Sequence, residues 1–198
     1  MDRRHFLRTL VAAGGVTLYI SRADAMKFYP KTGKQKWAVL FGSRYGSARD
    51  AAYWISEGMG GIAEVFDARE NPDLSSFHSV IVGSGIYSGK IDTNLESYLS
   101  RSSGQFSSHV KAAYIVCGGG DSPRAQAYVG LLAKSCGLAN PPSLAKVFPG
   151  RLTIRLLTPA DDNIQEEVAK KFKQPYEDYD RLQRKDCLKF GEEVLTKT

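Results

Sequence analysis

The strongest constraint on this fold is an apolar run that ends abruptly at small and hydroxyl residues. Residues 37–41 read Trp-Ala-Val-Leu-Phe, residues 42–47 read Gly-Ser-Arg-Tyr-Gly-Ser, and a helical pattern begins at Ala48. This order predicts a strand, a turn and a helix. A turn rich in Ser and Gly can direct its backbone N–H groups inward, and the helix start adds partial positive charge, so the turn suits a phosphate monoester.

The spacing within this turn separates it from two common phosphate loops. No Lys follows the second Gly, as a Walker A loop requires, and the stretch has no G-x-G-x-x-G for a dinucleotide. Gly-Ser turns also join strands to helices without binding a ligand, and that interpretation stays open at this point.

Strand and helix patterns alternate along the chain. We expect strands at 37–41, 62–66, 80–84, 112–117 and 145–148, the last resuming at 152–156, and helices at 48–58, 93–101, 124–136 and 179–195. Ile164, Val168 and Phe172 add a further helical spacing before the last helix. Such alternation implies right-handed crossovers and a doubly wound parallel sheet, an α/β fold.

Three turn segments of this pattern each follow a strand: 43–48, 84–90 and 118–122. In a parallel sheet they emerge at the same carboxyl edge, where doubly wound folds bind ligands. The first would hold a phosphate, and the other two would flank the group attached to it. The glycines at 118–120 would let backbone approach a flat ring, and Tyr87 offers a stacking face, although an ordinary surface aromatic is the alternative.

Length and composition indicate one soluble globular domain. The chain has 198 residues, of which 42% are apolar and 24% charged, and this excludes a disordered chain or a multi-span membrane protein. Lys and Arg total 27 against 21 Asp and Glu; without the four Arg and two Asp of residues 1–25 the balance is 23 against 19. This basic balance favours anionic ligands, but without a Lys/Arg-rich run it does not indicate nucleic acid.

The cysteines and histidines carry no metal or dithiol signal. Cys117, Cys136 and Cys187 are far apart and form no C-x-x-C, so buried free thiols are expected. His78 and His109 each precede an expected strand, and we expect no metal site.

The N-terminal residues have the layout of a signal peptide. Arg3, Arg4 and Arg8 precede an apolar run at 9–20 that is short for a membrane span, and small residues follow at 23–25. The run Arg-Arg-His-Phe-Leu at 3–7 resembles the twin-arginine export signal, with Arg8 in place of the usual Lys. That resemblance implies a twin-arginine signal peptide at 1–25, a linker at 26–36, a domain at 37–198 and a periplasmic or extracytoplasmic location. The alternative is an amphipathic helix or an uncleaved anchor; once processed, the chain would contact a membrane without spanning it.

From residue 36 to 194 the chain resembles the flavodoxin-like FMN proteins. Ser-Arg-Tyr-Gly-Ser-Ala at 43–48 matches their T-x-T-G-N-T phosphate loop, with Ser47 and Ala48 replacing Asn and Thr; residues 73–87 and 117–121 resemble their two flavin loops. The resemblance implies a flavodoxin-like three-layer αβα sandwich with a five-stranded parallel sheet in the order 2-1-3-4-5. FMN is the implied cofactor.

The resemblance also implies which residues contact the cofactor, and it names no catalytic residue. The expected FMN-binding residues are Ser43, Arg44, Tyr45, Gly46, Ser47, Ala48, Ser84, Gly85, Ile86, Tyr87, Ser88, Gly89, Lys90, Cys117, Gly118, Gly119, Gly120 and Asp121.

Within this family, residues 86–90 and the extra segment 148–172 are most similar to the menaquinone-dependent protoporphyrinogen oxidase branch. The leading expectation is an exported FMN-binding oxidoreductase or electron-transfer protein, with a redox partner protein or a quinone as its partner. The alternatives are a quinone-linked, protoporphyrinogen oxidase-like enzyme acting on an anionic small molecule, or a non-redox module that has lost FMN.

Overall fold

The computed structural model describes residues 35–120 and 122–198, without the side chain of Ser103. The predicted signal peptide at 1–25, residues 26–34 of the predicted linker and Asp121 lie outside the described residues.

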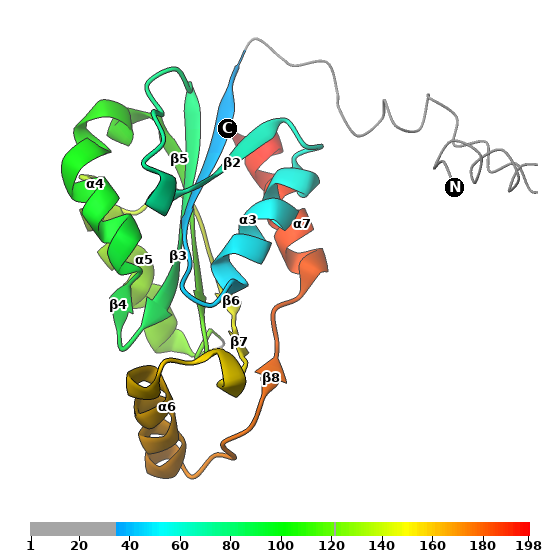
Figure 1. Cartoon of the computed structure of the whole chain (residues 1–198). Coiled ribbons are helices and arrows are strands. Elements are labelled where there is room, and N and C mark those ends of the chain that lie inside the picture. The colour runs from blue at the N-terminus through cyan, green and yellow to red at the C-terminus, as the bar shows by residue number, and fades with distance from the viewer. Residues whose placement is uncertain (1–34, 121) are drawn as a thin grey trace, which may run out of the picture.

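A parallel sheet forms the centre of the molecule (Figure 1). Its strands are β1 (Trp37–Gly42), β2 (Ala63–Asp67), β3 (Ser79–Tyr87), β5 (Val110–Cys117) and β6 (Leu144–Pro149), in the order β2-β1-β3-β5-β6. Counted without the short β4, this is the predicted 2-1-3-4-5 order, which is confirmed. All of β1 is buried, because both faces of the sheet are covered.

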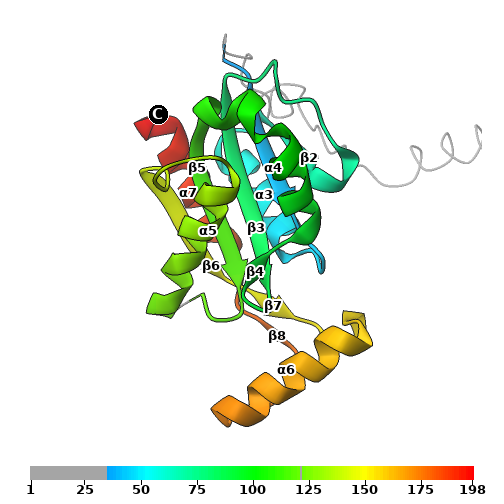
Figure 2. The same ribbon diagram turned by 90° about the vertical axis from the view of Figure 1, so that its left-hand side faces the viewer.

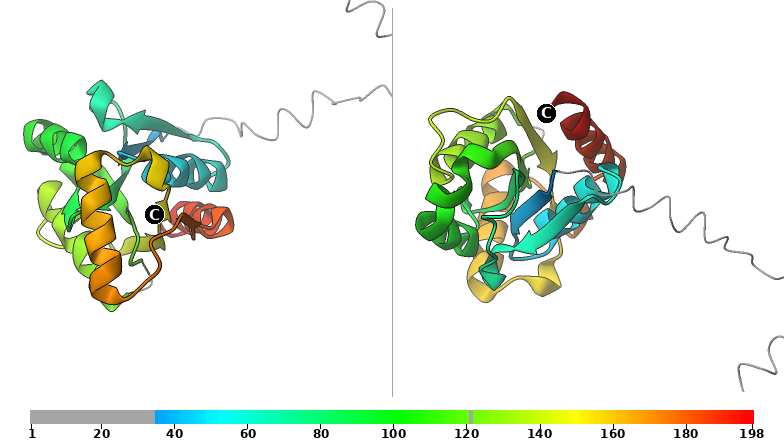
Figure 3. Two further views of the ribbon diagram at one scale, coloured as in Figure 1. Left: turned by 60° about the horizontal axis from the view of Figure 1, so that its bottom comes forward. Right: turned by 90° about the horizontal axis from the view of Figure 1, so that it is seen from above.

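Helices cover the sheet on both sides, as the view from above in Figure 3 shows. On one side lie α3 (Ser47–Gly58) and α7 (Arg184–Lys197); on the other lie α4 (Thr93–Phe106) and α5 (Ala127–Ser135). Alternate residues of β1 pack into the hydrophobic cores on the two faces of the sheet: Leu40 into the core under α4, and Val39 into the core under α3. The predicted three-layer αβα sandwich is therefore confirmed, and all three cysteines are buried, as predicted.

The structure corrects two predicted helices. The helix predicted at 124–136 is shorter, because residues 123–126 form a 3₁₀ turn, η3, and α5 spans Ala127–Ser135, with Val129, Leu132 and Ala133 buried. The last helix begins at Arg184 rather than at 179, because Tyr179–Asp180 form β8, which pairs antiparallel with β7 (Arg151–Leu152). Tyr179 and Asp180, which the sequence pattern placed in the last helix, are therefore in a strand.

The predicted loop at 84–90 is also different. Strand β3 continues to Tyr87, and a two-residue turn leads into β4 (Lys90–Ile91), which pairs antiparallel with β3. Both turn residues are left-handed, with φ of 51° at Ser88 and 79° at Gly89, as a tight hairpin turn requires. This segment is the end of a β-hairpin.

Residues 150–180 leave the sandwich. After β7 comes a 3₁₀ turn, η4 (Ile154–Leu156), and then α6 (Pro159–Phe172), which lies across the carboxyl edge of the sheet below the other helices (Figures 1 and 2). The strand predicted to resume at 152–156 is therefore limited to the short β7. We call residues 150–180 the insert. None of the helices in the described part of the chain combines the length and apolar content needed to cross a bilayer.

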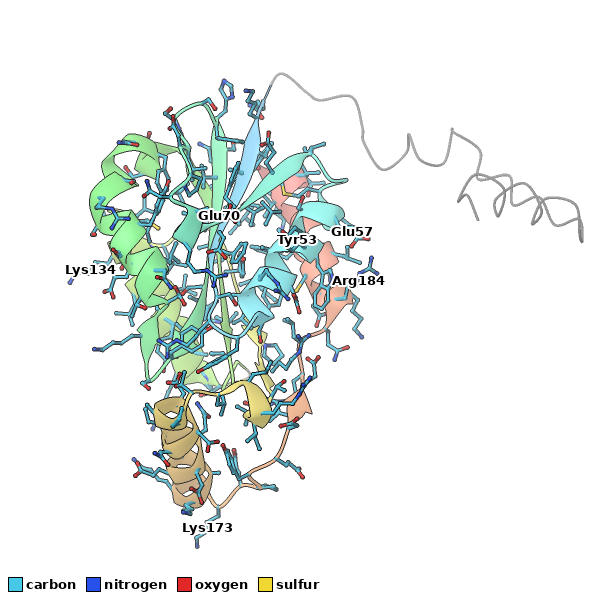
Figure 4. The ribbon with its side chains drawn as sticks, viewed as in Figure 1. Tyr53, Glu57, Glu70, Lys134, Lys173 and Arg184 are labelled. Carbon is cyan, nitrogen blue, oxygen red and sulfur yellow. The ribbon has the colours of Figure 1, made fainter. Side chains whose placement is uncertain are left out.

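Glycines bring α3 and α7 into close contact. A Cβ on Gly58 would lie 2.1 Å from the Leu188 carbonyl oxygen, and one on Gly191 would lie 2.2 Å from the Ile55 carbonyl oxygen. An ion pair between Glu57 and Arg184 joins the same two helices at the surface (Figure 4).

We expect Gly191→Ala to destabilise the fold, because the new methyl group meets backbone that cannot move aside. Overpacking of this kind costs about 1–3 kcal/mol. Gly130→Ala in α5 is the matched control: nothing lies within 4 Å of its Cβ position, so helix propensity should stabilise it slightly. Denaturant unfolding of both variants measures the difference, and equal unfolding midpoints would contradict the close helix contact.

Candidate functional site

The turn between β1 and α3 leaves a helix N-terminus open. Gly46, the N-cap of α3, is left-handed at φ 90° and has no side chain to accept a hydrogen bond from the first turn. Ser43 Oγ accepts the Gly46 N–H at 3.1 Å, which shapes the turn. The first-turn amides of α3 and the helix dipole therefore face outward at the carboxyl edge, and this arrangement attracts an anion.

Tyr87 folds back onto this turn. The Arg44 backbone N–H donates to Tyr87 Oη at 2.6 Å, and the Arg44 guanidinium lies 4.6 Å from the centre of the ring. The ring covers Gly85 so closely that a Cβ there would lie 2.6 Å from Tyr87 Oη. Burial raises the pKa of Tyr87, although hydrogen bonds from the turn oppose the rise. A neutral phenol thus lies against the predicted phosphate loop.

Asp161 of α6 joins the insert to the same turn. Its Oδ2 accepts hydrogen bonds from the Arg44 guanidinium at 2.6 Å and from the Tyr45 hydroxyl. Thr158 caps α6 by accepting the Asp161 N–H, and its own N–H donates to the Tyr45 oxygen, both at 3.2 Å. Burial raises the pKa of Asp161, but the hydrogen bonds from Tyr45 and Arg44 lower it more, so the pKa lies below its ordinary value.

A cavity of about 80 Å³ lies where these groups meet. The three predicted turn segments contribute Tyr45, Ser47, Gly85, Ile86, Tyr87, Ser88, Cys117 and Gly118 to its wall. The insert contributes Gly150, Arg151, Leu152, Thr153, Leu157, Asp161, Gln165 and Tyr179, and Val116 completes the wall. The structure thus brings the three predicted segments together, and the insert is a fourth segment that lines the cavity.

Other predicted residues lie near the cavity without lining it. Ser43, Arg44, Gly46 and Ala48 build the first turn, and the Ser84 hydroxyl is buried, donating to the Gly85 carbonyl. Lys90 is exposed on β4, and Gly89 is in the hairpin turn. Gly119 is not in the wall, and Gly120 faces β6, where a Cβ would lie 2.6 Å from the Phe148 backbone.

Sequence reasoning missed the residues that the insert brings to this edge. Arg151 donates to Asp50 on α3 at 2.9 Å and to Asp180 on β8 at 2.7 Å. Tyr179 lies close to Gly118: a Cβ on Gly118 would be only 2.7 Å from the Tyr179 hydroxyl. No local motif marks these residues; only the turn signal Pro149-Gly150 preceded them.

A buried carboxylate next to the first turn was also missed. Asp92 is 1% exposed and caps α4, since its Oδ1 accepts the N–H groups of Asn94 and Leu95. Its Oδ2 has no hydrogen-bond partner among the described residues. Gly42 is required here, because a Cβ would lie 2.8 Å from that of Asp92.

Comparison with known proteins agrees with this geometry. Residues 38–178 match the family model described as the flavodoxin domain. The chain belongs to the flavodoxin domain family. A search of curated proteins gave no match.

Two solved structures share the fold at low sequence identity. Oxidised flavodoxin 1 from Bacillus cereus is 15% identical, with a TM-score of 0.50 over 83% of this chain and 99% of that one. The Flv1 flavodiiron core from Synechocystis sp. PCC6803 is 13% identical, with a TM-score of 0.51 over 88% of this chain and 38% of that one. At such identities the likeness concerns the fold alone.

The residues of this flavodoxin domain suit a phosphate better than they suit a flat ring in the present arrangement. The open end of α3 and the Ser43 and Ser47 hydroxyls supply donors of the kind a phosphate needs. The cavity of about 80 Å³ is smaller than typical ligand pockets of about 300 Å³ or more. A bound flavin would therefore need the Tyr87 side chain or the insert to move. The described residues contain no group of three or more His, Cys, Asp or Glu suited to a metal ion.

We expect Asp161→Asn to destabilise the protein by about 1 kcal/mol at pH 7, because it replaces an ionised acceptor of charged hydrogen bonds. The folded-state pKa lies below the ordinary 3.8, so the contribution is complete well above pH 3.8 and is lost as pH falls through the lower folded value. Urea unfolding of both proteins from pH 7 to pH 3 measures this. A difference that stays constant with pH would contradict the assigned role of the carboxylate.

Proposed function

We propose that this flavodoxin domain binds FMN at the carboxyl edge and works as a redox protein. The observation that carries the proposal is the uncapped N-terminus of α3, which opens toward a cavity shared by all three predicted segments. The family supports the same cofactor.

Each part of the edge has a distinct role in this proposal. The amides of 43–48 and the hydroxyls of Ser43 and Ser47 hold the phosphate, and Arg44 adds positive charge beside it. The end of β3 and the backbone of Gly118 hold the ring edges, with Tyr179 and the insert excluding water. Tyr87 leaves the turn and becomes free to stack. FMN supplies the electron chemistry, and the protein supplies position and electrostatics.

We expect Ser47→Asp to weaken FMN binding by at least about 10-fold, because a carboxylate in the first turn of α3 repels the phosphate while suiting the helix dipole. Riboflavin, which has no phosphate, should bind both proteins equally. Ser47→Ala is the control for loss of the hydroxyl. Flavin fluorescence titration measures all three affinities, and thermal unfolding confirms that Ser47→Asp remains folded.

Failure of the purified full chain to bind FMN at all would contradict the proposal and favour the non-redox alternative. A Ser47→Asp protein that binds FMN as tightly as the parent would instead show that the phosphate lies elsewhere.

We expect Tyr87→Phe to strengthen FMN binding by about 2- to 10-fold. The phenyl ring can still stack, but the hydroxyl no longer competes for the Arg44 N–H, and one hydrogen bond is worth about 0.5–1.5 kcal/mol. The same titration measures this change. Weaker binding would mean that the hydroxyl contacts the cofactor.

The insert favours a second candidate within the proposal, a quinone-linked enzyme of the protoporphyrinogen oxidase type. Leu152 and Leu157 add apolar surface and Gln165 adds a polar group to the cavity wall, and the basic balance of the chain suits an anionic substrate. A carrier would instead pass electrons to a protein partner. Steady-state turnover with a menaquinone analogue separates the two, since a carrier does not turn over a small acceptor.

We also propose that the chain is exported by the twin-arginine route and acts in the periplasm or another extracytoplasmic space. The arginine pair at 3–4, the short apolar run at 9–20 and the small residues at 23–25 support this proposal.

A further inference from the structure

Three tyrosines line the cavity, and two of them are held by contacts of the first turn. Tyr87 accepts a backbone N–H of that turn, and Tyr45 donates its hydroxyl proton to Asp161. Tyr179, the third tyrosine, is on β8 and lies against Gly118 of the third predicted segment instead. An anion that takes over the donors of the first turn therefore does not compete with the contact between Tyr179 and Gly118.

Strand pairing holds Tyr179 in place. Tyr179 pairs with Leu152 in the antiparallel ladder of β7 and β8, and Leu152 also lines the cavity. Two residues further along the chain, the Arg181 backbone N–H donates to the Gly150 carbonyl oxygen at 3.2 Å. The ring of Tyr179 is thus carried by a paired strand rather than by a free loop.

The side chain of Tyr179 contacts both Arg181 and Gly118. The guanidinium carbon of Arg181 lies 4.5 Å from the centre of the ring, and Arg181 Nη2 donates to the Gly118 carbonyl oxygen at 2.5 Å. The Tyr179 hydroxyl is only 2.7 Å from the position of a Cβ on Gly118. The sequence predicts that glycine here lets backbone approach a flat ring. In the folded chain, the flat ring that approaches Gly118 is that of Tyr179.

We propose that Tyr179 provides the flat surface on which the ring of the bound flavin stacks. This inference rests on the proposed function, because it requires that FMN binds at this edge. Arg181 covers one face of the Tyr179 ring, and the opposite face is the one we assign to the flavin. Two aromatic rings stacked with an offset attract each other beyond the effect of the buried area alone. Tyr179 would therefore select for a flat ring, whereas the first turn selects for the phosphate.

The arrangement of the cavity favours stacking over a role in excluding water alone. The first turn and Tyr179 both contribute to its wall, so a ligand anchored by its phosphate at the first turn extends toward Tyr179. Departure of Tyr87 from the first turn would enlarge the cavity and would not require β8 to move. Tyr179 thus offers its ring in the position that the strand pairing already defines.

The first test compares Tyr179→Leu with Tyr179→Phe in the full chain, with riboflavin and FMN as the two ligands. Tyr179→Leu keeps the apolar bulk but removes the ring, so both ligands should bind about 3- to 10-fold more weakly. Tyr179→Phe keeps the ring, so both should bind within about twofold of the parent. Flavin fluorescence titration measures the affinities, and thermal unfolding confirms that the variants remain folded.

Tyr53→Leu is the control for this test. Tyr53 is 56% exposed on α3 (Figure 4), and its loss should leave both affinities unchanged. Unchanged binding by Tyr179→Leu would overturn the stacking role, and so would tighter binding, because the ring would then block the cavity. A loss with Tyr179→Phe as large as with Tyr179→Leu would assign the effect to the hydroxyl instead of the ring. A loss for FMN alone would place Tyr179 beside the phosphate.

The second test uses the contact with Gly118. Gly118→Ala places a methyl group 2.7 Å from the Tyr179 hydroxyl but 4.0 Å from Tyr179 Cζ, which is an ordinary contact distance. The alanine should therefore displace the Tyr179 side chain and weaken riboflavin binding at least about threefold. Adding Tyr179→Phe removes the clashing oxygen and should restore the affinity to within about twofold of the parent. A double variant that binds as weakly as Gly118→Ala alone would overturn the assigned position of the ring.

These measurements separate the stacking role from the proposed function. A parent protein that binds neither FMN nor riboflavin would contradict the proposed function and this inference with it. A parent that binds both, with affinities that Tyr179→Leu leaves unchanged, would overturn the stacking role alone.

Discussion

The complete burial of β1 is the constraint on which this structure depends. Its backbone pairs with β2 and β3, and helices cover both faces, so its side chains alternate between two cores. The last residue of the strand has to be glycine, because a Cβ on Gly42 would lie 2.5 Å from that of Leu95. The chain then turns sharply into α3 and directs the amides of that helix outward at the point where the strand order reverses. The position of the site follows from this burial.

The first turn is already engaged by the protein's own groups. Tyr87 accepts the Arg44 N–H, and the Asp161 carboxylate accepts from the side chains of Arg44 and Tyr45. Both are acceptors, like the phosphate oxygens that such a turn attracts. The hydrogen bonds keep the cavity small and join the insert to the core. Under the proposed function, an incoming phosphate would compete for the same donors, and this competition would couple cofactor binding to the position of the insert through Arg44.

The insert separates this chain from a plain sandwich. Asp161 and Gln165 of α6 line the cavity beside a polar turn, and Ile164, Val168 and Phe172 on the same helix are at least 36% exposed. Ion pairs such as Arg151 with Asp50 join the insert to the core. Such contacts are weaker than apolar packing, which makes the insert the part of the described structure best suited to respond to a ligand or a partner.

The sequence by itself determined the layers, the strand order and the edge at which the predicted segments 43–48, 84–90 and 118–122 follow their strands. Periodicity and right-handed crossovers are local and general rules, so they could be read without coordinates. Tertiary structure alone decided that the Tyr87 side chain lies against the first turn, that the segment after Ser84 is a hairpin, and that Arg151, Asp161 and Tyr179 reach the same cavity. These contacts join residues far apart in the chain through side chains, and no local pattern records which of several polar partners a side chain will reach. Helix α6 shows the same limit: spacing predicts that Ile164, Val168 and Phe172 share a face, but their exposure of at least 36% depends on what the helix packs against.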